Sequence, residues 1–214
     1  MIKISPSILS ADFANLERDI KRIETADYVH VDVIDGLFAP NITIGIPVVK
    51  CIRPITDLPL DVHLMIDRPV RYVEEFCKAG ADIITVHVES DTEENILKAL
   101  EIIHTCGKKA GIVLKPGTPA EAALPFMEQC QMILAMTVEP GFSGQRFKPE
   151  VMPKLRQLRQ WIDEKGLDCE LEVDGGVNPE TAAVCRAAGA NVLVAGSDVF
   201  KAADRAARIK SLRG

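Results

Sequence analysis

The sequence has little of what marks secreted, membrane-spanning or disordered proteins. Only six of its 214 residues are cysteine, and no two of them form a C-x-x-C site. Cysteines scattered in this way indicate reduced thiols in a cytosolic protein rather than a disulfide scaffold. No segment approaches the roughly 18 consecutive apolar residues of a membrane-spanning helix, and no basic N-terminal segment precedes an apolar run. We therefore expect a cytoplasmic protein with no membrane partner.

Positive charge is also scarce. The chain has 25 Lys and Arg residues against 31 Asp and Glu residues, which gives a formal net charge of −6. This balance argues against a general nucleic-acid-binding protein. It is compatible with a phosphorylated small molecule as ligand, because backbone N–H groups hold phosphate without net positive charge. With no linker and no shift in composition, the chain is typical of a globular protein, and we predict one domain over residues 1–214.

What the sequence does contain is a repeated pattern: a β-branched run, a turn and an amphipathic stretch. Eight such alternations favour an all-parallel α/β fold, and eight units are the number that closes a (β/α)8 TIM barrel. An open doubly wound sheet is the alternative, but the segment 5–10 lacks the G-x-G-x-x-G turn usual after its first strand. The strand candidates are Ile2–Leu9, Tyr28–Asp35, Leu60–Ile66, Ile83–Glu89, Lys109–Lys115, Met132–Glu139, Cys169–Asp174 and Val192–Ala195.

Helical stretches are expected between these strands. Asp12 is a candidate N-cap for the first one, in which Phe13, Leu16, Ile20 and Ile23 follow helical spacing. This spacing predicts a helix that includes all four residues.

Alternation within the predicted strands places ionisable side chains inside the barrel. In the second strand the valines share the face that suits packing under helices, which leaves His30 and Asp32 pointing inward. The same alternation turns His63 inward from the third strand and Asp174 inward from the seventh. Barrel enzymes build their sites at the carboxyl ends of the strands, where all four residues lie.

Ionisable groups in a barrel interior are costly unless they are paired or bound to a cation. Two imidazoles and two carboxylates form a set that suits Zn²⁺, Fe²⁺, Mn²⁺ or Co²⁺. A buried salt-bridge network without a metal is the alternative. Convergence from three different strands favours one divalent metal ion.

Glycine-rich turns follow the last three predicted strands, at 139–145, 174–178 and 195–198. In barrel enzymes the loops after strands seven and eight commonly hold phosphate, since glycine lets backbone N–H groups approach the anion closely. One such loop would be explained by chain turning alone, but three in consecutive units at the same end favour a phosphate site.

Several spaced motifs, in order, resemble those of the ribulose-phosphate 3-epimerases: Val31–Gly36, Asn41–Thr43, Asp61–Met65, Val138–Gln145 and Val173–Val177. The resemblance runs essentially end to end. It implies a TIM barrel, a divalent metal, a homo-oligomer and interconversion of D-ribulose 5-phosphate with D-xylulose 5-phosphate in the pentose phosphate pathway. It also implies metal ligands at His30, Asp32, His63 and Asp174, and an acid/base pair at Asp32 and Asp174. The implied substrate contacts are Ser7, His63, Met65, Met136, Gly141, Phe142, Ser143, Gly144, Gly175, Gly176, Gly196 and Ser197.

Two positions depart from the family pattern, which commonly has Met where this chain has Ile34 and His where it has Leu37. Neither is an implied ligand or acid/base residue, but both bear on substrate preference. D-allulose-6-phosphate 3-epimerase is therefore kept as an alternative activity.

The mechanism implied by the two carboxylates is proton removal next to a carbonyl and proton return to the opposite face, through a metal-stabilised enediolate. A lyase that forms a Schiff base through Lys115 is a second hypothesis. A non-catalytic phosphate-binding barrel is a third. His87 also faces inward by strand alternation, and we interpret it as a core or supporting histidine rather than a ligand.

Overall fold

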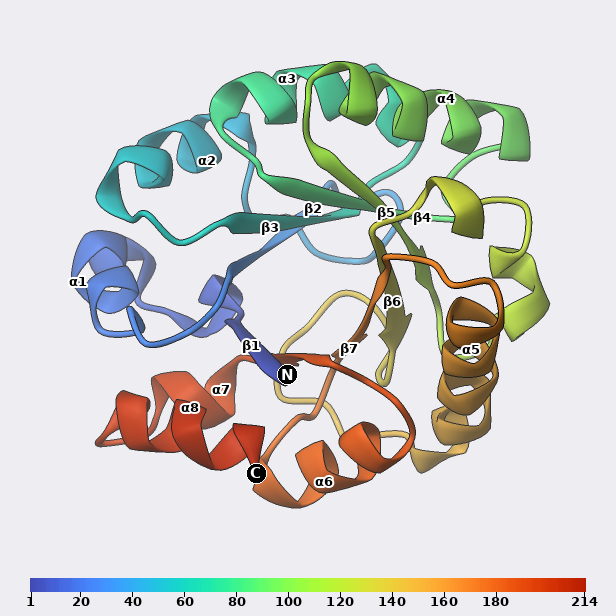
Figure 1. Ribbon diagram of the computed structural model, residues 1–214. Coiled ribbons are helices and arrows are strands. Elements are labelled where there is room, and N and C mark those ends of the chain that lie inside the picture. Colours follow the sequence, from blue (N-terminus) through green and yellow to red (C-terminus); the bar gives the residue numbers. More distant parts are fainter.

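The computed structural model describes all 214 residues, and its eight strands form one parallel sheet that curves into a barrel (Figure 1). The sheet edges β1 and β2 meet through a bridge between Ser7 and His30 and through bonds from the N–H groups of Asp27 and Tyr28 to the Ile4 carbonyl. The barrel is thus nearly closed, and the predicted fold class is confirmed. The strands are β1 (Lys3–Pro6), β2 (Val29–Ile34), β3 (Leu60–Met65), β4 (Ile83–His87), β5 (Lys109–Leu114), β6 (Met132–Met136), β7 (Glu170–Asp174) and β8 (Val192–Ala195).

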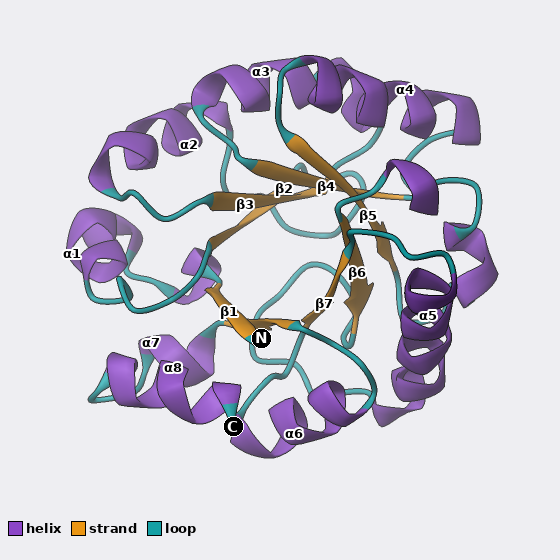
Figure 2. Ribbon diagram, in the orientation of Figure 1, coloured by secondary structure: helices purple, strands orange, loops and turns teal.

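Helices surround the strands on the outside of the barrel (Figure 2). Their apolar faces and the outward faces of the strands form the main hydrophobic core, which includes Val29, Val31 and Val33 of β2. The helices are α1 (Leu16–Lys21), α2 (Ile46–Ile52), α3 (Val73–Ala79), α4 (Glu93–Thr105), α5 (Met152–Glu164), α6 (Pro179–Ala187), α7 (Ser197–Phe200) and α8 (Arg205–Arg213).

The fifth unit departs from the expected strand–helix alternation. Between β5 and β6 the chain forms two short 3-10 segments, Ala120–Ala123 and Met127–Gln129, in place of an α-helix. Pro119 and Pro125 flank the first segment. Because proline donates no backbone hydrogen bond and clashes with the preceding turn, the stretch cannot continue as a regular helix.

The first helical stretch is also shorter than its spacing predicts. Asp12 caps a 3-10 turn over Phe13–Asn15, with its carboxylate accepting from the Ala14 N–H, and α1 begins only at Leu16. The prediction that the helix includes Phe13 is wrong, and the Phe13 side chain is 47% exposed. A 3-10 turn has about three residues per turn, which rotates Phe13 away from the face that α1 buries.

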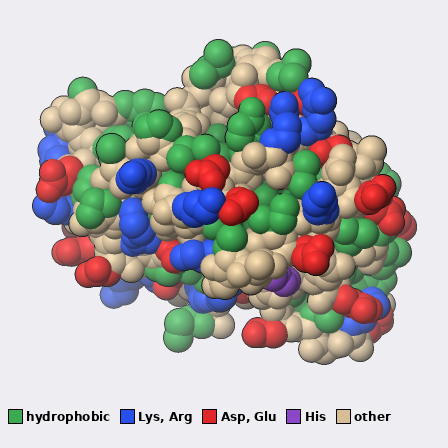
Figure 3. Space-filling view, turned by 90° about the horizontal axis from the view of Figure 1, so that it is seen from above, with side chains coloured by type: hydrophobic (Ala, Val, Ile, Leu, Met, Phe, Trp, Pro, Cys, Tyr) green, Lys and Arg blue, Asp and Glu red, His purple; other side chains and the backbone are tan.

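The surface is mixed in character. Acidic and basic side chains are interspersed over the face seen in Figure 3. None of the helices combines the length and the apolar character needed to cross a bilayer. All six cysteines are free thiols, as the sequence predicts.

Register between neighbouring strands positions the inward-facing polar residues. Asp32 of β2 pairs with His63 of β3, and His30 pairs with Asp61 one layer deeper in the barrel. Asp174, the last residue of β7, pairs with Met136 of β6. The barrel interior therefore carries stacked layers of polar side chains, and its upper layer lies where the strands end.

Candidate active site

Four side chains from three strands meet at the carboxyl end of the barrel: His30, Asp32, His63 and Asp174. One donor atom from each lies within 4.8 Å of the other three. The Asp32 Oδ1 atom is 3.4 Å from His30 Nε2 and 3.4 Å from His63 Nδ1. Asp174 Oδ2 is 3.8 Å from His63 Nδ1. The structure thus brings together all four residues that the sequence selects as metal ligands.

The donor atoms of this cluster fit a divalent metal ion. His30 Nε2 and His63 Nδ1 are buried and have no hydrogen-bond partner, although both face the carboxylates. A tetrahedral ion with ligand bonds of about 2.1 Å holds its donors about 3.4 Å apart. The two contacts of Asp32 with the imidazole nitrogens have this spacing, while Asp174 Oδ2 lies 3.8 Å from His63 Nδ1. Two imidazole nitrogens and two carboxylate oxygens could hold Zn²⁺, Fe²⁺, Mn²⁺ or Co²⁺.

The second nitrogen of each histidine is occupied by another side chain. His30 Nδ1 lies 2.7 Å from Asp61 Oδ2, and Asp61 also accepts from the Ser5 hydroxyl at 2.9 Å. His63 Nε2 lies 3.0 Å from His87 Nε2, on β4. These contacts orient both rings so that their remaining nitrogens face the carboxylates.

The two carboxyls of the cluster have opposite tendencies to hold a proton. Burial favours the neutral acid at Asp32, but the positive charge of the neighbouring His30 outweighs it and holds the pKa of Asp32 far below its usual range. Burial, reinforced by the negative charge of Asp32, raises the pKa of Asp174 to about 6. Environments that separate the pKa values of two neighbouring acids are typical of an acid/base pair.

Charged neighbours also shift the pKa values of two side chains deeper in the barrel, His30 and Glu172. Burial disfavours the charged imidazole of His30, but the carboxylates of Asp61 and Asp32 together raise its pKa well above the usual value. Burial, helped by Asp61, raises the pKa of Glu172 well above that of an ordinary carboxyl. Neither oxygen of Glu172 has a hydrogen-bond partner in the protein.

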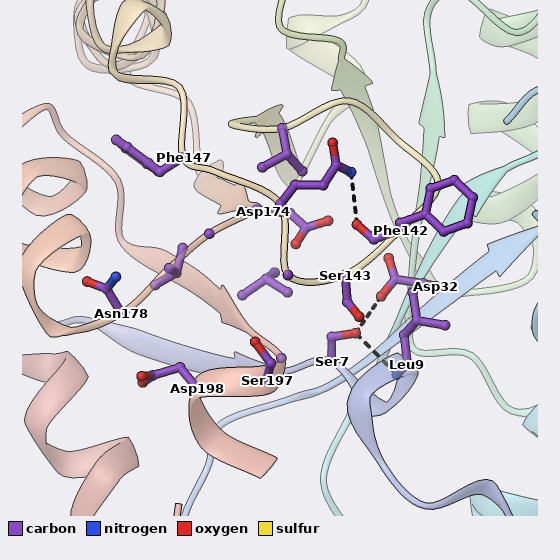
Figure 4. A pocket seen from close by; sticks show the side chains of 18 of the residues that line it. Ser7, Leu9, Asp32, Phe142, Ser143, Phe147, Asp174, Asn178, Ser197 and Asp198 are labelled. Carbon is purple, nitrogen blue, oxygen red and sulfur yellow. Dashed lines mark hydrogen bonds between the residues drawn. The ribbon is translucent and has the colours of Figure 1, made fainter. Parts of the chain in front are cut away.

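A cavity of about 830 Å³ opens above the cluster. Asp32 and Asp174 lie in its wall, and the Ser7 hydroxyl donates to Asp32 Oδ2 at 2.5 Å (Figure 4). His63 lies underneath, fully buried. The other residues implied as substrate contacts all line this cavity: Ser7, Met65, Met136, Gly141, Phe142, Ser143, Gly144, Gly175, Gly176, Gly196 and Ser197.

Two of the lining glycines are required by packing. Gly175 has a φ of +122°, and a Cβ there would lie 2.5 Å from a methyl group of Val138. Gly176 has a φ of +66°, and its Cβ would lie 2.9 Å from the backbone nitrogen of Phe147. Both residues therefore allow the chain after β7 to approach the β6–α5 loop closely.

Sequence reasoning missed several residues at the far end of the cavity. Asn178 and Asp198 line it, and Figure 4 places them with Ser197 on the side away from Phe142. Arg208 of α8 also lines it, with its guanidinium 3.3 Å from Asp198 Oδ1. Asn178 and Asp198 follow the glycine turns, which is a usable signal, whereas nothing local in the sequence brings α8 to this cavity.

Lys115, the residue of the Schiff-base hypothesis, follows β5 but does not line the cavity. Its ammonium lies 3.9 Å from the centroid of the Phe38 ring. A cation held over an aromatic face is stabilised there without a substrate.

Comparison with known proteins decides the family. Residues 3–200 match the model of the ribulose-phosphate 3 epimerase family. The chain belongs to the ribulose-phosphate 3-epimerase family. A ribulose-phosphate 3-epimerase of Bacillus subtilis is 51% identical, with 100% of this chain and 99% of the relative covered. The Synechocystis enzyme of that name is 52% identical over 99% of this chain and 93% of the relative.

More distant solved structures share the fold of this epimerase family member. A 3-hexulose-6-phosphate synthase from Salmonella typhimurium superposes with a TM-score of 0.75 at 18% identity, covering 99% of this chain and 97% of that one. KGPDC from Streptococcus mutans superposes with a TM-score of 0.75 at 12% identity, covering 99% and 95%. At these identities the likeness supports the barrel alone.

Proposed function

We propose that this chain is a metal-dependent epimerase that inverts C3 of a ketose phosphate, converting D-ribulose 5-phosphate to D-xylulose 5-phosphate. The observation that carries the proposal is the convergence of Asp32 and Asp174, from β2 and β7, on two buried imidazoles in the wall of one cavity. Family membership and the names of the relatives support the substrate.

Epimerisation at C3 needs a base on one face of the carbon and an acid on the other. Asp32 and Asp174 come from well-separated strands and supply one carboxyl each. The carboxylate removes the C3 proton, which is acidified by the neighbouring carbonyl, and the protonated partner returns one from the opposite side. In the reverse reaction the two residues exchange roles. The low pKa of Asp32 and the raised pKa of Asp174 support such a division.

His30, Asp32, His63 and Asp174 would hold the metal ion. When bound, a divalent cation stabilises negative charge that develops on the substrate oxygens. The N₂O₂ donor set accepts several ions, so the identity of the metal depends on availability.

The far end of the cavity would take the phosphate. Gly175, Gly176, Gly196 and Ser197 line the cavity at the turns after β7 and β8, and glycine leaves backbone N–H groups open to an anion. Ser7 orients Asp32 through its hydroxyl. Met65 and Met136 supply an apolar wall beside the two carboxyls. The sugar would thereby lie with its phosphate away from the metal cluster.

We further propose that residues 1–214 act as one catalytic domain in the cytoplasm and that the chains self-associate, as the family resemblance implies. Light scattering of the purified protein measures the association: a mass above that of one chain supports it, and a monomer at micromolar concentration contradicts it.

The decisive experiment combines metal analysis of the purified protein with epimerase assays on D-ribulose 5-phosphate and D-allulose 6-phosphate. We expect one divalent ion per chain, chelator-sensitive turnover and faster turnover of the pentulose. Faster turnover of the hexulose would move the assignment to the allulose-6-phosphate enzyme, in line with Ile34 and Leu37. Absence of turnover on both sugars would contradict the proposal.

A further inference from the structure

Behind the metal cluster, β4 and the turn after it carry two polar residues outside the set implied by the family resemblance. His87, the last residue of β4, is fully buried, and its Nε2 lies 3.0 Å from His63 Nε2. Its other nitrogen, Nδ1, lies 3.0 Å from Glu89 Oε2. Glu89 therefore contacts His87, and His87 contacts the Nε2 atom of His63, which is the ring nitrogen that does not face Asp32 and Asp174.

The protons in this chain have one consistent arrangement. An ionised carboxylate only accepts hydrogen bonds, so the proton on His87 lies at Nδ1, facing Glu89. Burial between other rings favours a neutral imidazole, whose Nε2 is then an acceptor. His63 must accordingly donate from Nε2, and this leaves the lone pair of its Nδ1 directed at Asp32 and Asp174. That lone pair is the one that a metal ion requires.

Glu89 is itself held firmly in place. Its Oε1 accepts from the backbone N–H of Lys115 at 2.8 Å and from the hydroxyl of Thr118. Both partners belong to the loop after β5. Glu89 is thus anchored to the loop after β5 as well as to His87 of β4.

The His87 ring is clamped between two others. It stacks on His63, with centroids 5.1 Å apart and planes at 29°, and the Phe38 ring lies 4.6 Å away. Packing on both faces limits rotation of the ring. The orientation needed for the two hydrogen bonds is therefore fixed by contact as well as by the bonds themselves.

The two histidines of the cluster differ in their supporting partners. His30 Nδ1 contacts a carboxylate directly, whereas His63 reaches a carboxylate only through another imidazole. Partners behind a metal ligand fix its tautomer and orientation, and their loss typically lowers metal affinity about 10- to 100-fold.

We infer that His87 and Glu89 are positioning residues that fix the tautomer and orientation of His63, so that its Nδ1 is presented to a divalent metal ion. This inference rests on the metal site of the proposed function. Neither residue lines the substrate cavity, and neither belongs to the four-residue cluster.

Two variants of His87 test the inference, and they differ in whether the new side chain can form hydrogen bonds. His87→Gln can keep an acceptor toward His63 and a donor toward Glu89, while His87→Leu fills similar space with neither group. His104→Gln serves as the matched control, because His104 is an exposed residue of α4 with no side-chain hydrogen bond. Circular dichroism and urea unfolding establish that each variant is folded.

Two measurements are made on each full-length protein after dialysis against a chelator. Competition with a chromophoric chelator gives the dissociation constant for Co²⁺, and two-bond proton–nitrogen NMR reports which ring nitrogen of each histidine is protonated. The chain has only four histidines, so the spectrum can be assigned from the variants themselves.

We expect His63 protonated at Nε2 and His87 at Nδ1 in the wild-type chain. We expect the Co²⁺ dissociation constant to rise about 10- to 100-fold in His87→Leu and to stay near wild type in His87→Gln and His104→Gln. A proton on Nδ1 of His63, or equal affinities for the Leu and Gln variants, would overturn the inference. If His87→Leu does not fold, the wild-type tautomers and His87→Gln still decide it. A wild-type chain that binds no Co²⁺ would contradict the metal site of the proposed function, while the tautomers would separately test the positioning role.

Discussion

Asp32 and His63 occupy paired positions on neighbouring strands, and the Oδ1 atom of Asp32 lies 3.4 Å from the Nδ1 atom of His63. Since successive residues of a strand point to opposite faces, this register turns both side chains into the barrel. His30 lies two residues before Asp32 and so reaches the same cluster from the same strand. Strand register therefore determines much of the geometry of the site.

The role of Asp174 as an acid/base residue can be tested by Asp174→Asn. The amide fills the same space but cannot exchange a proton, so turnover of D-ribulose 5-phosphate should fall about 10²- to 10⁴-fold. Circular dichroism should be unchanged. Asp163→Asn, on the exposed face of α5, is the control and should keep full activity. Near-wild-type turnover by a folded Asp174→Asn protein with its metal bound would contradict the two-carboxylate scheme.

Ser7 should influence catalysis through Asp32. Its hydroxyl donates to Asp32 Oδ2 at 2.5 Å, and a donor to a carboxylate stabilises the ionised form. In Ser7→Ala the Asp32 carboxylate loses this donor, which weakens both its ionised form and its fixed orientation. A hydrogen bond to a charged group contributes about 1.5–3 kcal/mol, so kcat/KM should fall roughly 10- to 100-fold. A kcat/KM equal to that of the wild type would remove Ser7 from this role.

Much of this arrangement is predictable from the sequence, because it depends on local periodicity. Alternation of valine with His30 and Asp32 predicts the inward face correctly, and eight repeats predict the barrel. The contact between His87 and His63 is not predictable in the same way. It depends on the register between β3 and β4, which no feature of either strand specifies alone.

Other misses have more than one origin. Arg208 reaches the cavity only because α8 packs beside α7 once the barrel has closed. The helical spacing of Phe13 predicts that it lies in the first helix, but a 3-10 turn over Phe13–Asn15 precedes α1. The missing helix of the fifth unit could have been found from Pro119 and Pro125, since proline is a local signal.

Gly176→Ala should distort the loop after β7, which lines the cavity. Its φ of +66° disfavours any Cβ, and the new methyl group would meet the Phe147 backbone at 2.9 Å. Gly107→Ala is the matched control, because Gly107 has a φ of +72° but nothing within 4 Å of its Cβ. We expect Gly107→Ala to lose about 1–2 kcal/mol of unfolding free energy, the cost of the left-handed backbone alone. Gly176→Ala should lose more unfolding free energy than Gly107→Ala and should also raise KM. The same loss in both variants, with KM unchanged in Gly176→Ala, would contradict the packing role of Gly176.

The buried carboxyl of Glu172 should make stability depend on pH. Because burial and Asp61 raise its pKa in the folded chain, the folded state keeps a proton that the unfolded state releases. Stability should therefore fall as pH rises above the ordinary carboxyl pKa of about 4.3, by at most about 1.4 kcal/mol per pH unit. Glu172→Gln removes this titration, so its unfolding free energy relative to wild type should be higher at pH 8 than at pH 5. Urea unfolding in the presence of a chelator measures the unfolding free energies of both proteins at each pH. If the difference between Glu172→Gln and wild type is the same at pH 5 and pH 8, the raised pKa of Glu172 is contradicted.

The most direct test of the central claim is the fate of the C3 hydrogen. The wild-type protein is incubated with D-ribulose 5-phosphate in D₂O, and the recovered D-xylulose 5-phosphate is analysed by NMR. If Asp32 and Asp174 exchange protons with C3 as proposed, the product carries solvent deuterium at that carbon. Product formed at the full rate with only protium at C3 would contradict proton transfer through these two carboxyls.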